Sequence, residues 1–336
     1  MVTRREVLKT AAALAGVGVV RGLISPEGAW AQKKKWQIVF HTKNVVNPFW
    51  KACAVGAKVS ADRWKDEVEL IDAAPTKPDN IEEQIRIMED WITKKPNAMI
   101  FVPVDYVALA PTVQKAVDAG IPIINYNNRM PGSKVVTFVG SDDEQMGYDI
   151  ARHAFKSVGE KGKVVILDGV PGASTAQDRH RGFMRALQEV KGMELLAAQP
   201  ANYSRLLGMQ VMENMLQRFP VIDIVLAAND EQALGAVEAI DAVGRLAKIK
   251  VTGCDATPPG IQSILQGRQF STLGFSGFDQ GYITVEAAYR FLKGEKLPQQ
   301  IMLPVPVVDK SNAEPYNIPL EQRKPPVWDQ VLAAQK

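Results

Sequence analysis

Residues 221–236, Val-Ile-Asp-Ile-Val-Leu-Ala-Ala-Asn-Asp-Glu-Gln-Ala-Leu-Gly-Ala, contain the unit from which the fold can be predicted. Val221–Ala227 is a short, mainly apolar run, which is typical of a strand with both faces covered. Asn229 and Asp230 follow it, and both residue types favour helix N-termini. A helical pattern then runs over Asp230–Val243. The stretch therefore predicts a strand, a polar turn and a helix in succession.

The same unit recurs along most of the chain. We expect strands at Trp36–Phe40, Val68–Ile71, Ala98–Val102, Ile121–Asn125, Val135–Val139, Val164–Leu167, Leu195–Ala198, Val221–Ala227, Ile249–Cys254 and Ile301–Val308. We expect helices near Phe49–Trp64, Ile81–Lys94, Ala108–Ala119, Tyr148–Ser157, Gly182–Glu189, Leu206–Arg218, Asp230–Val243 and Tyr282–Leu292. Strands alternating with helices predict βαβ units and parallel sheets. Because the pattern restarts near residues 140–142, we expect an α/β protein with two lobes of similar build, followed from Pro315 by a proline-rich tail over the surface.

Length and composition exclude several classes of protein. The chain has 336 residues, 40 Lys and Arg against 37 Asp and Glu, and two cysteines. This charge balance leaves no basic excess for a nucleic-acid partner. Two cysteines cannot form a disulfide scaffold or a four-cysteine zinc site. We expect Cys53 and Cys254 to be separate buried thiols.

The first thirty-one residues have the features of an export signal. Arg4 and Arg5 precede the apolar run Thr10–Val20, and a small-residue site follows at residues 29–31. This order is typical of a secretory signal, and the arginine pair indicates the twin-arginine type. The apolar run is too short for a stable membrane anchor. Because residue 32 is Gln and not Cys, we expect a soluble periplasmic product without a lipid.

Polar side chains follow several expected strands. The polar residues at the ends of expected strands are Asn47, Asn127, Asn128, Asn229 and Asp255. Arg179 opens an expected helix. In parallel α/β sheets, ligands bind beyond the carboxyl ends of the strands. Amides, a carboxylate and a guanidinium suit a small ligand with many hydroxyl groups. Any one asparagine here is favoured to cap a helix or a turn, but the set recurs in both halves and therefore favours a site.

Four stretches resemble a known family. They are Asn47–Trp50, Gly172–Ser174 with Arg179–Phe183, Asn229–Gly235 and Gly253–Pro258. Together they resemble the periplasmic sugar-binding proteins of ABC importers, of the ribose-binding type. The resemblance covers roughly residues 36–310. It implies two Rossmann-like lobes with parallel sheets, joined by a three-stranded hinge. It also implies a non-enzymatic protein that passes a small sugar or polyol to a membrane permease.

The resemblance further implies boundaries and a site. We expect an export signal at 1–31, a first lobe from 36–141 with 276–303, a second lobe from 142–275 with 304–318, and a tail at 319–336. The implied ligand-binding residues are Lys43, Asn47, Phe49, Trp50, Asn127, Asn128, Arg179, Tyr203, Asn229, Asp255 and Phe275. Asn127 and Asn128 stand where ribose binders carry Asp-Arg, and Phe275 replaces a polar hinge residue. A deoxysugar, a polyol or another small hydroxylated compound is therefore favoured over ribose.

Two residues near the end of the first expected strand, Lys43 and His41, each allow two interpretations. Lys43 is favoured to face solvent, whereas an inward Lys43 would favour a ligand with a carbonyl or carboxylate. His41 is favoured as a packing residue over a catalytic base. We expect Asp142 and Asp143 to cap the next helix.

Three functions other than import could use the same two-lobed scaffold. An enzyme on the same scaffold lacks support, because the chain beyond the signal has no phosphate loop, nucleophile elbow or zinc-protease motif. A transcription regulator would need a DNA-binding segment where the export signal stands. A ligand-sensing receptor for chemotaxis or quorum signalling would use the same fold and stays open. We expect a monomer with no cofactor, no metal and no nucleic-acid partner.

Overall fold

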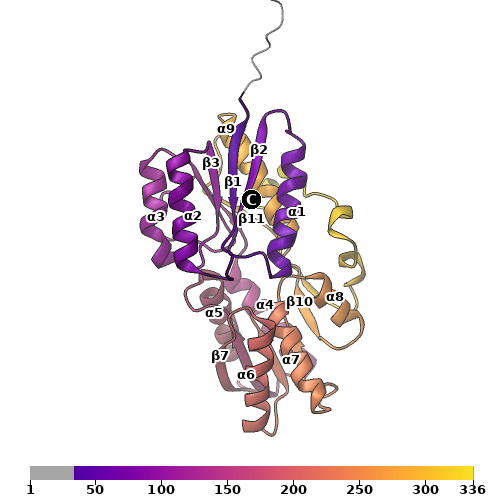
Figure 1. The fold of residues 1–336 in the computed structure, drawn as a ribbon. Helices are drawn as coiled ribbons and strands as arrows, with labels where there is room; N and C mark the ends of the chain where they lie inside the picture. The colour runs from indigo at the N-terminus through magenta and orange to yellow at the C-terminus, as the bar shows by residue number, and fades with distance from the viewer. Residues whose placement is uncertain (1–33, 336) are drawn as a thin grey trace, which may run out of the picture. The chain divides into compact units, whose positions relative to one another are not determined.

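The computed structural model describes residues 34–335, and the expected export signal lies outside them. Residues 35–336 form one compact unit that contains two six-stranded sheets (Figure 1). The α/β class with two similar sheets is confirmed.

The first sheet has the strand order β11-β5-β4-β3-β1-β2, and all its strands are parallel. Its strands are β1 (Trp36–His41), β2 (Val68–Ala73), β3 (Ala98–Phe101), β4 (Ile123–Tyr126), β5 (Thr137–Gly140) and β11 (Gln300–Met302). Alternate residues point to opposite faces. Phe40 and Ile100 pack with α1 (Pro48–Asp62) and α9 (Gly277–Leu292), whereas Val39 and Met99 pack with α2 (Ile81–Lys94) and α3 (Tyr106–Asp118).

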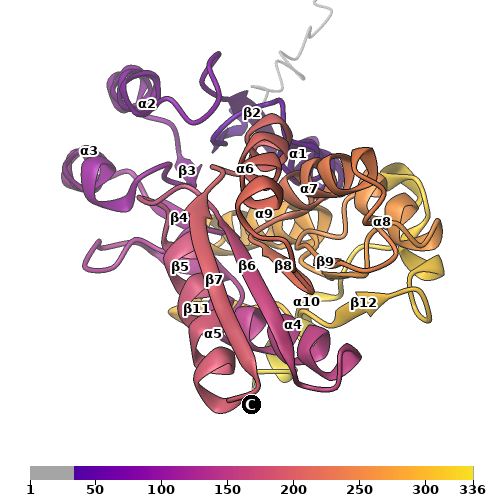
Figure 2. The ribbon, with the colours of Figure 1, turned by 90° about the horizontal axis from the view of Figure 1, so that it is seen from below.

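The second sheet has the order β12-β10-β9-β8-β6-β7 and is parallel except for its edge strand β12. Its strands are β6 (Gly162–Asp168), β7 (Met193–Pro200), β8 (Ile224–Ala227), β9 (Lys250–Thr252), β10 (Ser271–Leu273) and β12 (Val307–Asp309). One face is covered by α4 (Asp143–Ser157) and α5 (Ser174–Glu189), and the other by α6 (Arg205–Arg218) and α7 (Asp230–Ala242), with α8 (Pro258–Leu265) beside α7. Figure 2 shows these strands from below, with helices on both sides.

The chain passes between the two sheets three times. The crossings are residues 141–142, 274–276 and 303–306. The expected single strand Ile301–Val308 is wrong, because the chain leaves β11 in one sheet and enters β12 in the other. Pro304 and Pro306 lack the N–H groups that a continuous strand would donate. Instead the Leu303 N–H donates to the Gly140 carbonyl, and the Gly274 N–H donates to the Pro306 carbonyl.

Some elements differ from their expected bounds. Helices α4 and α5 begin at Asp143 and Ser174, well before the expected Tyr148 and Gly182. Arg179 therefore lies inside α5 and does not open it. Sequence patterns also missed α8 and β10, because both are too short for a clear period.

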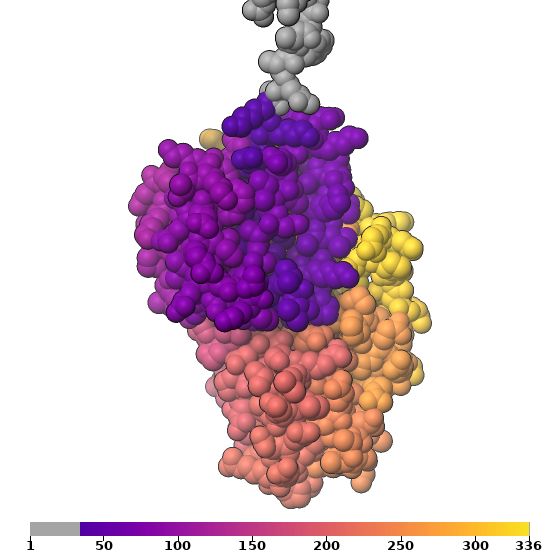
Figure 3. Space-filling view, viewed as in Figure 1, coloured from indigo at the N-terminus to yellow at the C-terminus, as the bar shows by residue number. Residues whose placement is uncertain are grey.

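The C-terminal segment, residues 310–335, returns from the second sheet to the first. Its short helix Glu314–Tyr316 packs on α8, Leu320–Gln322 contacts α1, and α10 (Trp328–Ala333) packs on β11. Space-filling atoms of this segment, in yellow, lie along both lobes in Figure 3. The expectation that the whole tail covers the surface is wrong, because Trp328 and Val331 are buried in the core.

The C-terminal segment also touches the crossings. Pro326 and Val331 line a small cavity of about 100 Å³ together with residues of all three crossings, which include Ser141, Ser276 and Leu303. The segment thus lies directly against the connections between the lobes.

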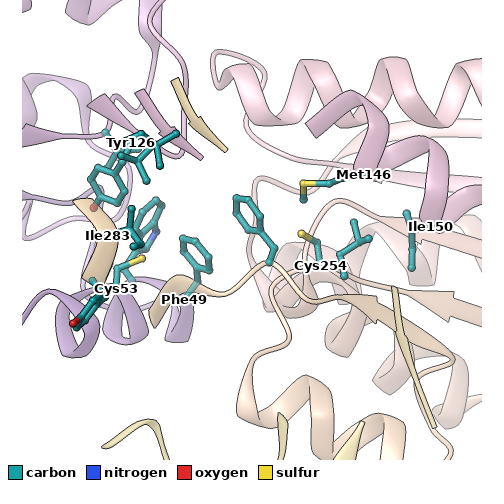
Figure 4. Close-up of a cluster of buried hydrophobic side chains, with 14 of the residues drawn as sticks. Phe49, Cys53, Tyr126, Met146, Ile150, Cys254 and Ile283 are labelled. Atoms are coloured by element: carbon teal, nitrogen blue, oxygen red, sulfur yellow. The ribbon is translucent and has the colours of Figure 1, made fainter. Parts of the chain in front are cut away.

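One hydrophobic cluster joins the two lobes. It contains Cys53 from α1 and Cys254 after β9, and Figure 4 shows these two on opposite sides with Phe49 between them. Both cysteines are free and buried, which confirms the prediction of separate thiols. Among the described residues, no helix is both long and apolar enough to cross a membrane.

Candidate functional site

A cavity of about 300 Å³ lies where loops from both sheets meet. It is bordered by the loop after β1, the loop after β4, the N-terminal part of α5, the loop after β7 and the loops after β8 and β9. These loops follow the carboxyl ends of parallel strands, which is the expected ligand position in such sheets. The structure places every expected site residue at this one cavity: Lys43, Asn47, Phe49, Trp50, Asn127, Asn128, Arg179, Tyr203, Asn229, Asp255 and Phe275.

The aromatic part of the wall comes from the start of α1. Asn47 caps this helix, since its Oδ1 accepts the Phe49 N–H at 2.9 Å, and Pro48 occupies the first turn. The ring of Phe49 meets Trp50 edge to face at 4.9 Å and stacks on Phe275 at 5.3 Å. Phe275 belongs to the second crossing, so the aromatic wall continues across the connection between the lobes.

Lys43 points inward, and the expectation of a solvent-facing lysine is wrong. Only 2% of the residue is exposed, and its Nζ lies 3.8 Å from Asp79 Oδ1. The same ammonium lies 5.8 Å from the Trp50 ring centre and 5.4 Å from that of Tyr203. Burial lowers the pKa of Lys43, while the nearby Asp79 carboxylate opposes this change.

His41 is not among the residues that line the cavity. It is fully buried, and its ring packs against Phe101 at 5.3 Å. Burial lowers the pKa of His41 to about 3, because a charged imidazolium would have no water around it. The structure therefore agrees with a packing residue.

The two asparagines after β4 have different roles. Asn128 bonds within the protein through both ends of its amide: its Nδ2 donates to the Pro103 carbonyl at 2.7 Å, and its Oδ1 accepts from Thr175 Oγ1 at 2.9 Å. Thr175 belongs to α5, so this bond joins the two lobes. Asn127 donates from Nδ2 to Gln280 Oε1 at 3.1 Å, which leaves its Oδ1 as an acceptor at the cavity.

Arg179 is the most tightly held charged group of the second lobe. Its Nε and Nη2 both contact Asp143 Oδ1, at 2.9 and 2.8 Å, and its Nη1 donates to the Ala228 carbonyl at 2.7 Å. The guanidinium lies over Phe275 at 4.8 Å. Burial raises the pKa of Asp143 to about 6, although Arg179 favours the carboxylate form. Pairing with Asp143 thus fixes the direction in which Arg179 faces.

Sequence reasoning missed this role of Asp143. The neighbouring Asp142 does cap α4, accepting the Gln145 N–H at 3.0 Å, whereas Asp143 turns inward. Two adjacent aspartates at a helix start do not reveal which one faces a cavity. Thr175 and Asp79 were missed as well, since neither stands in a distinctive pattern.

Asn229 and Asp255 complete the second lobe's wall. Asn229 caps α7 through Oδ1, which accepts the Gln232 N–H at 3.0 Å, so Nδ2 is its unused group. Burial raises the pKa of Asp255 well above its usual range, against the effect of Arg179. The backbone of Asp255 has φ 113°.

A buried carboxylate supports the Asp255 loop from behind. Asp230 accepts hydrogen bonds from the Thr257 N–H at 2.9 Å, Thr272 Oγ1 at 2.6 Å and Gln269 Nε2 at 3.0 Å. Its own N–H donates to the Cys254 carbonyl at 2.7 Å. Asp230 therefore fixes the loop that carries Asp255.

Backbone strain is concentrated at the cavity. Five non-glycine residues with positive φ line it: Asp79, Asn127, Asn202, Tyr203 and Asp255. Each such conformation costs on the order of 1–3 kcal/mol and persists only where the surroundings enforce it. The site is therefore held in shape by the fold, which favours recognition of a defined ligand.

The wall has the chemistry of a binding site. It combines amides, carboxyls, a guanidinium, an ammonium and aromatic rings, which can hold a polar ligand by hydrogen bonds and cover its C–H faces. Within residues 34–335, no group of three or more His, Cys, Asp or Glu side chains is placed to hold a metal ion.

Comparison with known proteins identifies relatives over most of the chain. A family model described as a periplasmic binding protein domain matches residues 38–296. The ribose import binding protein of Escherichia coli is 31% identical over 264 residues, which cover 79% of this chain and 87% of that protein.

Solved structures agree in both fold and sequence. A periplasmic solute-binding protein of an ABC transporter from Actinobacillus succinogenes, with bound D-allose, has a TM-score of 0.79 and 32% identity, covering 84% of this chain and 100% of that one. A solute-binding protein from Bacillus halodurans, with bound myo-inositol, has a TM-score of 0.80 and 31% identity, covering 84% and 97% of the two chains.

Proposed function

This chain belongs to the periplasmic binding protein family, and from that premise we propose that it captures a small sugar or polyol-like ligand between its two lobes and delivers it to a membrane ABC permease. The family consists of solute-binding proteins and not of enzymes. Hinge closure of two lobes around a ligand is driven by contacts that form only in the closed state.

The observation that carries this proposal is the mixed origin of the cavity wall. Asn47 and Trp50 come from the first lobe, whereas Arg179, Asn229 and Asp255 come from the second. The Thr175–Asn128 bond and the Lys43 ammonium over Tyr203 join the lobes directly at the cavity. A ligand bound here would touch both lobes, as closure requires.

The eleven expected residues are proposed to form the ligand site. Most would contact the ligand directly, while Asn128 would act mainly by joining the lobes, since both its Nδ2 and its Oδ1 already bond within the protein. A cavity of about 300 Å³ is at the small end of ligand sites, which suits one monosaccharide or cyclic polyol. The bound D-allose and myo-inositol of the two solved relatives have this size and chemistry.

Export and location follow from the first residues of the chain. We propose that residues 1–31 are a twin-arginine export signal and that the protein acts in the periplasm as a monomer. Arg4 and Arg5 before the apolar run support this proposal.

Ligand-dependent thermal stability tests the proposed function. The chain from Gln32 onward is mixed with ribose, allose, myo-inositol, alditols and sugar acids, and unfolding is followed by differential scanning fluorimetry. We expect at least one compound to raise the Tm, because only the folded state binds it. Isothermal calorimetry should then give a single site per chain. An unchanged Tm across the whole panel would contradict the proposal.

A further inference from the structure

The helix caps fix which atoms two cavity asparagines offer to a ligand, and this inference about ligand class rests on the proposed function. Asn47 and Asn229 each use Oδ1 to accept an N–H of their own helix. An amide has its acceptor on one atom and its donors on the other. Each residue therefore keeps its NH₂ group, for which no acceptor is found within residues 34–335, while its Oδ1 already accepts one hydrogen bond from the protein.

Lys43 adds a buried donor with an incomplete partner. Its Nζ is 3.8 Å from Asp79 Oδ1, which exceeds hydrogen-bond distance, and that oxygen already accepts from Asn44 Nδ2 at 3.3 Å. The aromatic rings of Trp50 and Tyr203 lie near the ammonium, and neither ring replaces the hydrogen bonds that water would give. A buried charge without full pairing is costly. The cavity thus contains an ammonium with unused donor capacity.

Arg179 contributes further donors. Its three nitrogens are engaged with Asp143 and the Ala228 carbonyl, yet Nη1 and Nη2 each retain a second N–H. Arg179 lines the same cavity as Lys43, and in addition to burial its charge helps to lower the pKa of Lys43. An anionic ligand in this cavity would be attracted by both cations.

The cavity also offers acceptors. Asn127 keeps its Oδ1, and the carboxyl groups of Asp79 and Asp255 line the wall. Glu231 pairs with Arg205 at 3.2 Å. A neutral polyol donates and accepts through each hydroxyl group, whereas a carboxylate only accepts. Because Lys43 lies at the wall with donor capacity that the protein leaves incomplete, its surroundings match a ligand with an oxygen-rich anionic end.

We propose that the ligand is a sugar acid whose carboxylate lies against the Lys43 ammonium, with its hydroxyl-bearing carbons between the aromatic wall and the second lobe. The two oxygens of the carboxylate would supply the acceptors that Lys43 lacks. Asn127 and Asp255 would then accept from the hydroxyl groups at the other end.

Matched ligand pairs test this proposal. Each pair shares its carbon configuration and differs at one terminal group: D-gluconate with D-glucitol, D-xylonate with xylitol, D-ribonate with ribitol, and D-galactonate with galactitol. Binding to the chain from Gln32 onward is measured by calorimetry at pH 7.5. For the pair that binds best, we expect the acid to bind at least ~10-fold more tightly than the alditol.

Two variants test whether Lys43 causes the preference for the acid over the alditol. Lys43→Met keeps an unbranched side chain, one atom shorter, and removes its charge, so it should abolish the preference for the acid. Lys51→Met changes an exposed lysine of α1 that does not line the cavity, and it should leave the preference intact. The wild-type comparison of acid and alditol remains decisive even if Lys43→Met fails to fold.

The contradicting results are distinct. Equal or tighter binding of the alditols, or an acid preference that survives in folded Lys43→Met, would overturn the sugar-acid assignment. Binding of neutral sugars or myo-inositol without any acid would overturn it too, while the proposed function would stand. If no acid, alditol, sugar or inositol binds, the proposed function itself fails.

Discussion

The two walls of the cavity differ in how their polar groups are held. In the second lobe, Arg179 is fixed by Asp143 and the Ala228 carbonyl, and Asp255 sits on a loop secured by Asp230. In the first lobe, Lys43 has one carboxylate at 3.8 Å and two neighbouring rings. The second wall is therefore preorganised by protein partners, whereas the first retains polar capacity that a ligand can satisfy.

This difference indicates where stability and binding depend on the same residues. Removing one partner of a buried pair leaves an uncompensated charge, so it damages the fold as well as the site. A group without a full protein partner can be changed with less harm to the fold. Variants of the second wall should therefore lower stability more than variants of the first.

The largest expected effect follows the loss of Arg179. Arg179→Met should lower the free energy of unfolding by about 3–5 kcal/mol, because Asp143 is left buried without its partner. Ligand binding should also fall below detection. Urea unfolding and calorimetry measure the two effects.

A double variant separates these effects. Asp143→Leu combined with Arg179→Met removes both charges and should recover most of the lost stability, while binding stays absent. If Arg179→Met alone is as stable as the wild type, the contrast between the two walls is wrong.

A smaller effect should follow from replacing one cavity asparagine in each lobe by aspartate. Asn47→Asp and Asn229→Asp keep the cap oxygen and replace the free NH₂ group by a second acceptor. Because Asp and Asn cap helices about equally, the unfolding free energy should change by less than ~0.5 kcal/mol in Asn47→Asp, where the residue is only partly buried. It should fall further in Asn229→Asp, because the new carboxylate is buried. Affinity should fall at least ~10-fold in both variants, since a donor facing the ligand is lost. Unchanged affinity in both would show that these amides do not face the ligand.

The smallest effect concerns two of the three histidines, His41 in the first lobe and His180 in the second. His180 Nδ1 lies 2.9 Å from Asp168 Oδ1, and this hydrogen bond raises the pKa of His180 above 6.5. Its stabilising contribution is thus complete below pH 6.5 and is lost as the pH rises through the folded-state pKa. Burial lowers the pKa of His41 to about 3, so the stability that it contributes depends on pH in the opposite direction. Its contribution to the free energy of unfolding is lost as the pH falls below 6.5.

Nuclear magnetic resonance titration of the imidazole signals tests this pair. The His180 signal should shift with a midpoint above 6.5, and Asp168→Asn should lower that midpoint. The His41 signal should not move between pH 5 and 8. A shared midpoint near 6.5 would mean that burial does not lower the pKa of His41 and that Asp168 does not raise the pKa of His180.

Much of the architecture could be predicted because buried parallel strands and polar turns leave clear patterns. Val221–Ala227 and Asn229 gave both a strand end and a helix cap. The apolar run at 301–308 did not show that its two ends join different sheets, and only the family resemblance placed a lobe boundary between 303 and 304. Asp143 and Lys43 were equally hidden, because burial of a charged side chain depends on neighbours distant in the sequence.

The return of the C-terminal segment has a practical consequence for optical sensing. None of the described residues 310–335 borders the ligand cavity, yet Pro326 and Val331 touch the connections between the lobes. An environment-sensitive dye on a cysteine introduced at Gln335 would follow the segment that packs on the crossings and would lie outside the ligand cavity. Its emission would then report movement of the lobes while solute capture proceeds without steric interference.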